Sequence, residues 1–273
     1  MKAKTQMAKA APPSAEHARL ITKLESVARL TRKDCAAIAA LPLRTRSVDA
    51  GADIIAEGDQ PRECCLVIDG LLCRYSITGA GDRQIVSFHI AGDLPDRDSL
   101  HLAAMDHGVC SVSPARVAFI PQPALLQLIE THPNVALALW RDTVTDGAIY
   151  RQWLTSVGRR TARQRLAHLV CEIYMRMAAV GLADGDHFSF PVTQTQLGYA
   201  LGLSAVHVNR TLQELRHEGL LTWKGPVVML LDHAALREVG DFDPGYLQLK
   251  PLAGQASSGV SPASRAGVAA SSA

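Results

Sequence analysis

The sequence has little of what marks several large classes of protein. Aromatic residues make up only 5% of its 273 residues, and the formal net charge is only +2. So small a charge does not by itself indicate a nucleic-acid-binding protein. The sequence contains no apolar run long enough to span a bilayer and no secretory hydrophobic region after its basic N-terminus. We therefore expect a cytoplasmic protein of one or two domains that does not enter a membrane.

Motifs for metals and for catalysis are missing as well. The six cysteines include no CxxC pair, so structural disulfides, zinc and an iron–sulfur cluster are not expected. The ten histidines include no HExxH pair. With no nucleophile–base pair and no phosphate loop, we predict no catalytic residues, no metal site and no enzyme activity. Cys64, Cys65 and Cys73 fit either buried small apolar residues or a redox sensor, and the sequence leaves this open.

The strongest pattern lies between residues 190 and 225. Thr193 followed by Gln196 forms a capping box, which predicts the start of a helix. Gly202 suits a tight corner after that helix, and Ser204 can cap a second one. The spacing of the apolar residues gives the two helices inner faces made of Leu197, Ala200, Leu201, Val208, Leu212 and Leu215.

A hairpin follows this helix pair. Residues 220–223 and 227–231 are apolar runs on either side of the turn Lys224-Gly225-Pro226. Two helices and a hairpin in this order predict a winged helix-turn-helix, which binds DNA. The alternative is a helical corner packed on a hairpin, with no nucleic acid bound. Four arginines that precede the motif fit either phosphate contacts or a solvated helix face: Arg159, Arg160, Arg163 and Arg165.

The N-terminal half predicts a different architecture. We expect a disordered tail over residues 1–18, and helical periodicity begins at Glu16 with Thr31 as a cap inside it. From about residue 43 short apolar runs alternate with glycine-containing turns. This spacing predicts a compact antiparallel barrel or jelly roll, with the β-roll domain spanning residues 19–132. The expected strands are 53–56, 65–68, 71–75, 85–90, 108–112 and 116–120.

A long helix is predicted over residues 133–158, between the β-roll and the winged helix-turn-helix domain of residues 159–240. One stripe of this helix has coiled-coil spacing, which fits either packing on the chain's own barrel or a parallel dimer seam, and we favour the seam. Residues 241–273 are predicted as a flexible tail. The fold class is therefore α+β. The residues of the stripe are Trp140, Thr143, Gly147, Tyr150, Leu154 and Val157.

The order of β-roll, long helix and winged helix-turn-helix resembles the Crp/Fnr family of bacterial transcription regulators over roughly residues 20–239. Two motifs carry the resemblance: GADIIAEGDQPRECCLVIDGLL in the roll and VTQTQLGYALGLSAVHVNRTLQELRHEGLL in the DNA-binding domain. The resemblance implies a homodimer on double-stranded DNA, with RNA polymerase as a further partner. Each subunit would place one recognition helix in successive major grooves of a pseudo-palindromic operator, about 34 Å apart.

The resemblance also implies roles for single residues. Arg210 matches the family's arginine that grips guanine O6 and N7. Val206 stands where the family has a glutamate, so contact with a thymine methyl and a different operator are expected. His207 and Asn209 supply the remaining polar edge. Contacts to DNA phosphate are expected from Thr193, Gln194, Ser204, Gln213 and Lys224.

The effector pocket departs from the family's pattern. Cyclic-nucleotide-binding members resemble one another in a Gly-Glu pair that holds ribose and an Arg-Ser pair that neutralises the phosphate. Here the first pair aligns with Asp96-Arg97 and the second with His107-Gly108. A neutral His107 provides no fixed positive charge for a phosphate, so cAMP is not predicted as a cofactor. Repulsion of an anion is expected from Asp93, Asp96, Asp98 and Asp106.

An iron–sulfur cluster and haem are two other candidate effectors. The N-terminal cysteine cluster of the oxygen-sensing branch is missing, so no iron–sulfur cluster is predicted. Haem ligation through His89, His101 or His107 stays open. We therefore predict a regulator that binds DNA without cAMP. The alternative is a cyclic-nucleotide-, redox- or haem-responsive regulator whose DNA binding needs a ligand at the β-roll.

Overall fold

The computed structural model describes residues 14–250, so most of the predicted N-terminal tail and of the tail from residue 251 lies outside the described residues. Two helices open this part of the chain, α1 (Ala15–Val27) and α2 (Arg32–Ala39). Thr31 caps α2, because its side chain accepts from Asp34 N–H while the Asp34 carboxylate accepts from Thr31 N–H. The tail predicted to reach residue 18 is too long, since α1 begins at Ala15. Leu20 and Leu24 are buried against the β-roll and α4, and this packing stabilises the helix from its first turn.

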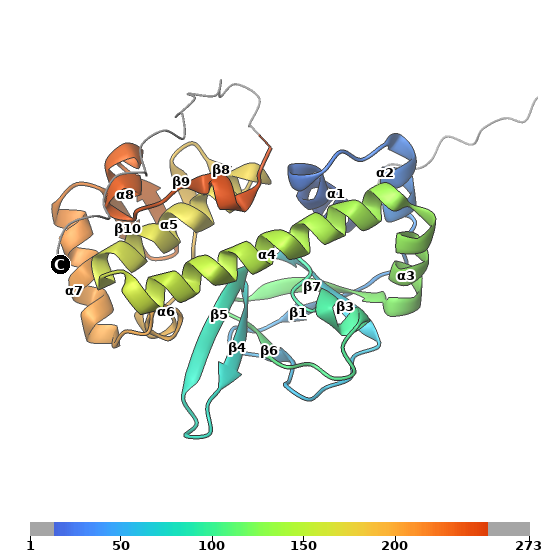
Figure 1. The fold of residues 1–273 in the computed structure, drawn as a ribbon, viewed down its shortest axis with the longest axis horizontal. Helices are drawn as coiled ribbons and strands as arrows, with labels where there is room; N and C mark the ends of the chain where they lie inside the picture. The colour runs from blue at the N-terminus through green and yellow to red at the C-terminus, as the bar shows by residue number, and fades with distance from the viewer. Residues whose placement is uncertain (1–13, 251–273) are drawn as a thin grey trace, which may run out of the picture.

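Seven antiparallel strands form the predicted β-roll (Figure 1). They make a three-stranded sheet in the order β1-β7-β3 and a four-stranded sheet in the order β2-β6-β4-β5. Strand β1 was not predicted, because its first four residues are polar and exposed and only Val48 is buried. The strands are β1 (Arg44–Val48), β2 (Asp53–Ile55), β3 (Glu63–Asp69), β4 (Leu72–Ile77), β5 (Arg83–His89), β6 (Gly108–Ser111) and β7 (Ala115–Pro121).

The two faces of the four-stranded sheet bury different partners. Leu72 and Val109 belong to the apolar core between the two sheets. Their neighbours Cys73 and Cys110 point the other way, as successive residues of a strand do, into the core shared with the C-terminal domain. The outer face of the sheet is therefore an interface between the β-roll and the DNA-binding half of the chain.

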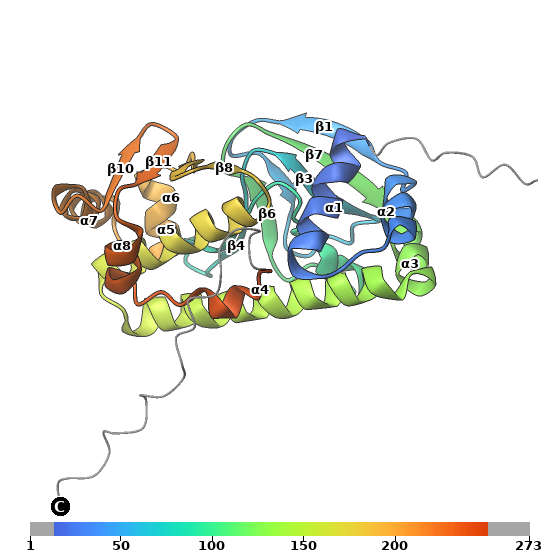
Figure 2. The same ribbon diagram turned by 90° about the horizontal axis from the view of Figure 1, so that it is seen from above.

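Helix α4 (Pro133–Arg159) is 27 residues long and runs along one whole side of the molecule (Figure 2). The helices η1 (Arg97–Leu100) and α3 (Gln122–Thr131) precede it, and His132 separates α3 from Pro133, the first residue of α4. Ile149 and Trp153 on its inner face are buried with the C-terminal domain, whereas Val135 and Ala138 pack against α1 and the roll. Among residues 14–250, no helix combines the length and apolar character that a membrane span requires.

The C-terminal domain has the predicted winged helix-turn-helix architecture. Its four-stranded sheet has the order β10-β11-β9-β8, so the predicted wing β10–β11 is extended by two strands that the sequence analysis missed. Helix α5 packs behind α7 and α8. The elements are α5 (Ala162–Ala179), β8 (Ala183–Asp184), β9 (His187–Ser189), α6 (Gln194–Leu201), α7 (Ala205–His217), β10 (Leu221–Lys224), β11 (Val227–Leu230), α8 (His233–Val239) and η2 (Pro244–Leu247).

Residues 241–250 are packed against the domain, and the prediction of a flexible tail from residue 241 is wrong for this segment. Phe242 and Tyr246 pack on the ring of His168, and Leu247 is buried. Further on, the Lys250 N–H donates to the Ser26 carbonyl at 3.0 Å. Aromatic burial therefore holds the segment, which connects the DNA-binding end of the molecule with α1.

Candidate DNA interface and effector pocket

The helix-turn-helix is built by local interactions that the sequence predicted. The Thr193 hydroxyl accepts from Gln196 N–H at 3.1 Å, and the Gln196 side chain accepts from Thr193 N–H at 2.8 Å. Gly202 ends α6 in the left-handed conformation at φ +64°. A Cβ on Gly198 would lie 2.5 Å from the Leu203 carbonyl oxygen, so the turn requires glycine here too. The tight turn therefore holds α7 close to α6.

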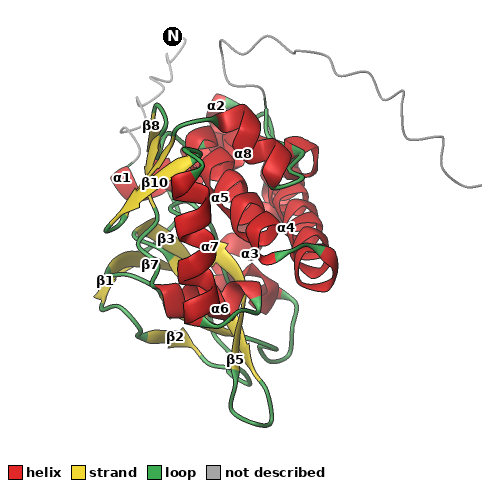
Figure 3. Ribbon diagram, turned by 90° about the vertical axis from the view of Figure 1, so that its left-hand side faces the viewer, coloured by secondary structure: helices red, strands yellow, loops and turns green. Residues whose placement is uncertain are grey.

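Helix α7 presents its first turns to solvent (Figure 3). The Ser204 hydroxyl caps the helix by accepting from His207 N–H at 3.2 Å. Val206 is 81% exposed, and Asn209 and Arg210 are exposed beside it, whereas His207 is half-buried. The opposite face is buried in the domain core through Val208, Thr211, Leu212 and Leu215. The predicted base-contacting residues thus lie on the outer face of a rigidly packed helix.

The predicted phosphate-contacting residues lie at the edges of the same surface. Thr193 and Ser204 stand at the N-termini of α6 and α7, where free backbone N–H groups and the helix dipole favour an anion. Lys224 lies at the tip of the wing. All five predicted positions are exposed: Thr193, Gln194, Ser204, Gln213 and Lys224.

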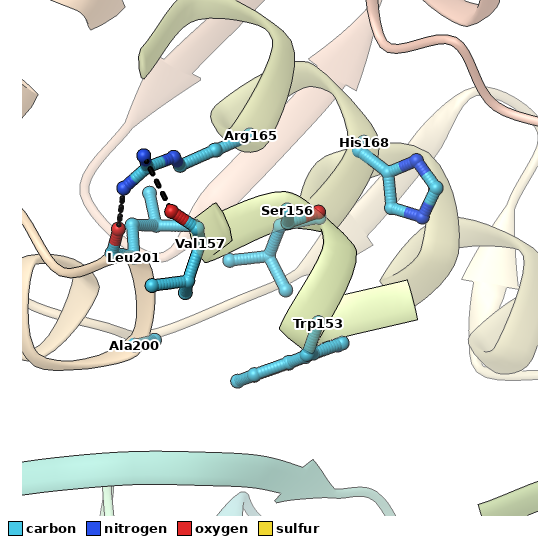
Figure 4. A pocket seen from close by; sticks show the side chains of 8 residues that line it. Trp153, Ser156, Val157, Arg165, His168, Ala200 and Leu201 are labelled. Atoms are coloured by element: carbon cyan, nitrogen blue, oxygen red, sulfur yellow. Dashed lines mark hydrogen bonds between the residues drawn. The ribbon is translucent and has the colours of Figure 1, made fainter. Parts of the chain in front are cut away.

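The arginine cluster before the motif holds the hinge between α4 and the DNA-binding domain. Arg165 donates to the carbonyls of Val157 and Leu201 at 2.8 Å each, joining the ends of α4 and α6 (Figure 4). Arg160 is buried and bonds to Ser156 at 2.9 Å, and Arg163 pairs with Glu218. Within the described part of the chain, three of the four guanidinium groups therefore bond to other groups of the protein, although the Arg163–Glu218 pair is partly exposed, and the fourth, that of Arg159, is exposed.

The predicted seam residues of α4 divide between two faces. Trp140, Leu154 and Val157 are exposed, by 65%, 75% and 42%. Thr143 and Tyr150 face the β-roll instead: the Thr143 hydroxyl accepts from Arg97 at 3.0 Å, and the Tyr150 hydroxyl accepts from Arg74 at 2.6 Å. Gly147 is half-buried beside Arg151. The exposed apolar stripe is completed by Leu137 and Val144.

The first residue pair of the predicted effector pocket bonds to other groups inside the protein. The buried Asp96 carboxylate accepts from Cys65 N–H at 2.8 and 3.0 Å, and burial raises the pKa of Asp96 to about 7. The neighbouring Arg97 points to α4, where it pairs with Asp142 at 2.6 Å and with Asp146. The Arg97 guanidinium is therefore neutralised inside the protein.

The second pair has different partners. His107 Nδ1 lies 2.6 Å from Asp106 Oδ1, and its other ring nitrogen is buried without a hydrogen-bond partner. A Cβ on Gly108 would lie 2.3 Å from the Tyr75 ring, which fills the place of a side chain there. The two predicted pocket pairs therefore have different contacts: Asp96 and Arg97 bond to β3 and α4, and His107 and Gly108 contact Asp106 and Tyr75.

His89 and His101 are the other two histidines that the sequence left open as haem ligands. His89 is buried and bonds to Ser87 at 2.8 Å, and burial lowers the pKa of its imidazole to about 4. His101 is exposed. Among residues 14–250, no group of three or more histidine, cysteine, aspartate or glutamate side chains is placed to hold a metal ion.

Substituting Asp96 by asparagine should change how stability depends on pH. Because the pKa of this carboxyl is about 7 in the folded chain and about 4 in an unfolded one, only the folded chain holds the proton between these values. The group's contribution to stability is therefore lost as the pH rises from about 4 to about 7, by at most about 1.4 kcal/mol per pH unit. Urea unfolding of both proteins at several pH values measures this, and parallel curves for the two proteins would contradict it.

A buried ionic network that the sequence analysis missed joins the domains. Asp93, after β5, lies 2.7 Å from Lys23 of α1 and 3.0 Å from Arg176 of α5. Arg176 also donates to the Phe88 carbonyl at 2.8 Å. Burial opposes ionisation of Asp93, but Lys23 and Arg176 outweigh it and hold its pKa well below the usual range. The signal in the sequence was the pair Glu172 and Arg176, which lie four residues apart on one helix and are both buried.

A β-roll, a long exposed helix and a winged helix-turn-helix together define a class of DNA-binding transcription regulators. The sequence profile of the Crp-like helix-turn-helix domain matches residues 164–239, and that of the cyclic nucleotide-binding domain matches residues 45–132. The chain belongs to the Crp/Fnr family of transcription regulators. The predicted family and fold class are thus confirmed.

Relatives at moderate identity support this assignment. Electron transport regulator A of Shewanella oneidensis is 25% identical over 193 residues, 71% of this chain and 77% of that one. Transcriptional activator protein FnrL of Cereibacter sphaeroides is 27% identical over 207 residues, 74% of this chain and 83% of that one. The structure of FixK2 from Bradyrhizobium japonicum has the same fold, with a TM-score of 0.66 and 23% identity over 73% of this chain and 98% of that one.

Proposed function

We propose that this regulator binds a pseudo-palindromic operator as a homodimer and needs no cAMP to do so. The observation that carries the proposal is the exposed start of α7, with Val206, Asn209 and Arg210 side by side above a buried helix face. In this proposal residues 19–132 act as the sensor, 133–158 as the dimerisation helix and 159–240 as the DNA-binding domain. The protein would work in the cytoplasm, where it meets DNA and RNA polymerase.

Readout of the operator would follow the chemistry of these side chains. The Arg210 guanidinium can donate two parallel hydrogen bonds to guanine, and Asn209 can pair with an adenine edge. The apolar Val206 favours a thymine methyl at the neighbouring position. Residues Thr193, Gln194, Ser204, Gln213 and Lys224 would bind phosphates and fix the register.

Dimerisation would use the outer stripe of α4. Leu137, Trp140, Val144 and Leu154 are all exposed. With Gly147 and Arg151 between them, they follow the alternating spacing of three and four residues of a coiled-coil seam. This proposed seam keeps three of the six residues predicted from the sequence: Trp140, Gly147 and Leu154. It is completed by Leu137 and Val144. Of the other predicted residues, Thr143 and Tyr150 bind the roll, and Val157 is exposed but lies one residue before the next position of the alternation.

Independence from cAMP is proposed because the pocket residues already have partners. Arg97, the arginine of the aligned pocket, is paired with Asp142 and Asp146, and the imidazole of His107 is paired with Asp106. A cyclic phosphate would have to displace these carboxylates. We also propose that the protein has no enzymatic activity and no resident cofactor, since DNA binding accounts for the motifs.

A second candidate function is a regulator that needs an effector. A cavity of about 240 Å³ between η1, α3 and α4 favours it, because its walls include Leu94, Leu125 and Leu139 together with Trp140 of the exposed stripe. An apolar molecule bound there would touch both the roll and the dimerisation helix. His101 also lines this cavity, so haem is a ligand to test.

Selection of bound sequences from a random duplex pool tests the proposal directly. The full chain is incubated with the pool alone, with cAMP and with haem, and the variant Arg210→Ala serves as the control for specific readout. We expect one palindrome, enriched equally without and with cAMP. Enrichment only with cAMP or only with haem would favour the second candidate, and enrichment in none of the pools would contradict specific DNA binding.

Charged substitutions on the stripe of α4 should dissociate the dimer. We expect Val144→Glu and Leu154→Glu, made together, to raise the dimer dissociation constant at least about tenfold, because charges do not tolerate burial in an apolar seam. Sedimentation equilibrium measures the mass. The control is Thr155→Glu, which adds a charge to an exposed position of the same helix outside the stripe. An unchanged mass in the double variant would exclude this seam.

A further inference from the structure

Two cysteine thiols face each other across strands β4 and β6. Cys73 and Cys110 are directly opposite in register, and their Sγ atoms are 3.3 Å apart. Opposite residues of antiparallel strands have Cα atoms about 4.5–5.5 Å apart. Disulfides span Cα separations of about 4.4–6.8 Å, so this pair can be bridged without a change of register.

The surroundings of the pair distinguish the two thiols. Arg83 Nη1 donates to Cys110 Sγ at 3.5 Å, and the Arg83 guanidinium lies over the Tyr75 ring. A hydrogen bond from the Cys73 thiol lowers the pKa of Cys110, burial opposes this, and Arg83 adds to the lowering. The pKa of Cys73 is raised by the same hydrogen bond and by burial. Cys110 is therefore the nucleophile of the pair, and Cys73 is the thiol that can resolve it.

Cys110 also lies closer to solvent. Across the sheet the residues in register are Asp53, Cys110, Cys73 and Phe88, from the edge strand β2 to the opposite edge strand β5. The Asp53 side chain at the edge is 53% exposed, and β2 has only three residues with a register shift beside Asp53. So short an edge strand opens at low energetic cost, which admits a small oxidant to Cys110.

At its Phe88 end, this row of four residues lies beside the helix-turn-helix. The Phe88 ring packs edge-on against Phe190, and Gln84 of β5 donates to the Ala200 carbonyl of α6 at 3.4 Å. Gln196 of α6 donates to the Val112 carbonyl, just after β6, at 3.5 Å. A change in the spacing of β4 and β6 would therefore act on the surface to which α6 is docked.

We propose that Cys73 and Cys110 form a reversible disulfide when the protein reacts with a hydroperoxide, and that this bond alters how α6 packs against the β-roll. The Cys110 thiolate attacks the hydroperoxide, the O–O bond breaks, and the leaving oxygen takes a proton as water or an alcohol. The Cys73 thiol then loses its proton and attacks the sulfenic sulfur, which releases water. Two thiols are oxidised, and one hydroperoxide is reduced by two electrons. A dithiol reductant reverses the step.

Mass spectrometry of the full chain tests the chemistry. The reduced protein is treated with one equivalent of hydrogen peroxide, alkylated and digested with trypsin. We expect a link between residues 63–74 and 98–116 that is two hydrogens lighter than the two peptides and disappears with dithiothreitol. Because residues 63–74 also contain Cys64 and Cys65, fragmentation of the linked peptide, and the matched variant Cys64→Ala/Cys65→Ala, assign the bond to Cys73.

The single variants separate the two roles. Cys73→Ala should leave Cys110 as a sulfenic acid that dimedone traps, and Cys110→Ala should leave Cys73 unoxidised. Unreacted thiols in the wild type, or a link that uses Cys64 or Cys65, would overturn the assignment, and neither result depends on whether a variant folds.

Hydrogen exchange tests the connection to α6 without using DNA, so its outcome is independent of the proposed function. We expect the amides of residues 195–201 to exchange at different rates in the reduced and the oxidised protein. Those of α8, which packs on α5, should exchange equally in both. A disulfide that leaves the exchange of α6 unchanged would overturn the second half of the proposal.

Discussion

Substituting Asp93 by asparagine should lower the free energy of unfolding by about 3–5 kcal/mol, the usual cost of removing one partner from a buried ion pair. Asp93 is 2% exposed and contacts Lys23, Arg176 and His89, which come from α1, α5 and β5. The amide would leave two buried cations without their shared anion. Urea unfolding followed by circular dichroism measures the loss.

The exposed pair Arg44–Glu63 provides the matched control. Glu63→Gln makes the same chemical change, but the two side chains are 61% and 36% exposed, so we expect a loss below about 1 kcal/mol. Equal losses from Asp93→Asn and Glu63→Gln would contradict the structural role of the network. A double-mutant cycle that combines Asp93→Asn with Arg176→Met isolates the interaction between these two side chains. The losses in the free energy of unfolding from the two single substitutions should be far from additive.

Local signals explain why so much of the fold could be predicted. The capping boxes at Thr193 and Thr31 and the left-handed Gly202 act within a few residues, so they can be read directly from the sequence. Short apolar runs between glycine-containing turns marked six of the seven strands of the roll. Strand β1 was not predicted because its side chains are mostly exposed. It is a strand because it pairs with β7, which is distant in the sequence.

Contacts between distant segments explain most of what was missed. Thr143 and Tyr150 fit a seam by their spacing, but Arg97 and Arg74 of the roll bind them, and no local pattern indicates this. The opposition of Cys73 and Cys110 likewise depends on the register of β4 with β6. The exposed face of α7, which we propose contacts the bases, could be predicted from the sequence because one helix supplies all of its residues.

Arg210→Ala should weaken binding to the selected operator by about 1–3 kcal/mol for each half-site and relax discrimination at one base pair. The reason is geometric, because only a guanidinium can grip guanine O6 and N7 with two parallel donors. Arg210 is exposed, and its nearest charged partner, Glu214, lies 3.9 Å away, so its removal should hardly change the melting temperature. Fluorescence anisotropy with the operator and with single-base variants measures both effects.

Two controls separate base readout from simple charge. Arg237→Ala removes the same charge from α8, outside the helix-turn-helix, and should leave operator affinity nearly unchanged. Arg210→Lys keeps the charge but loses the paired donors, so it should bind random DNA like the wild type and the operator more weakly. If Arg210→Ala loses the same affinity on operator and random DNA, Arg210 contacts only phosphate, and the specificity of α7 must then come from Val206, His207 and Asn209.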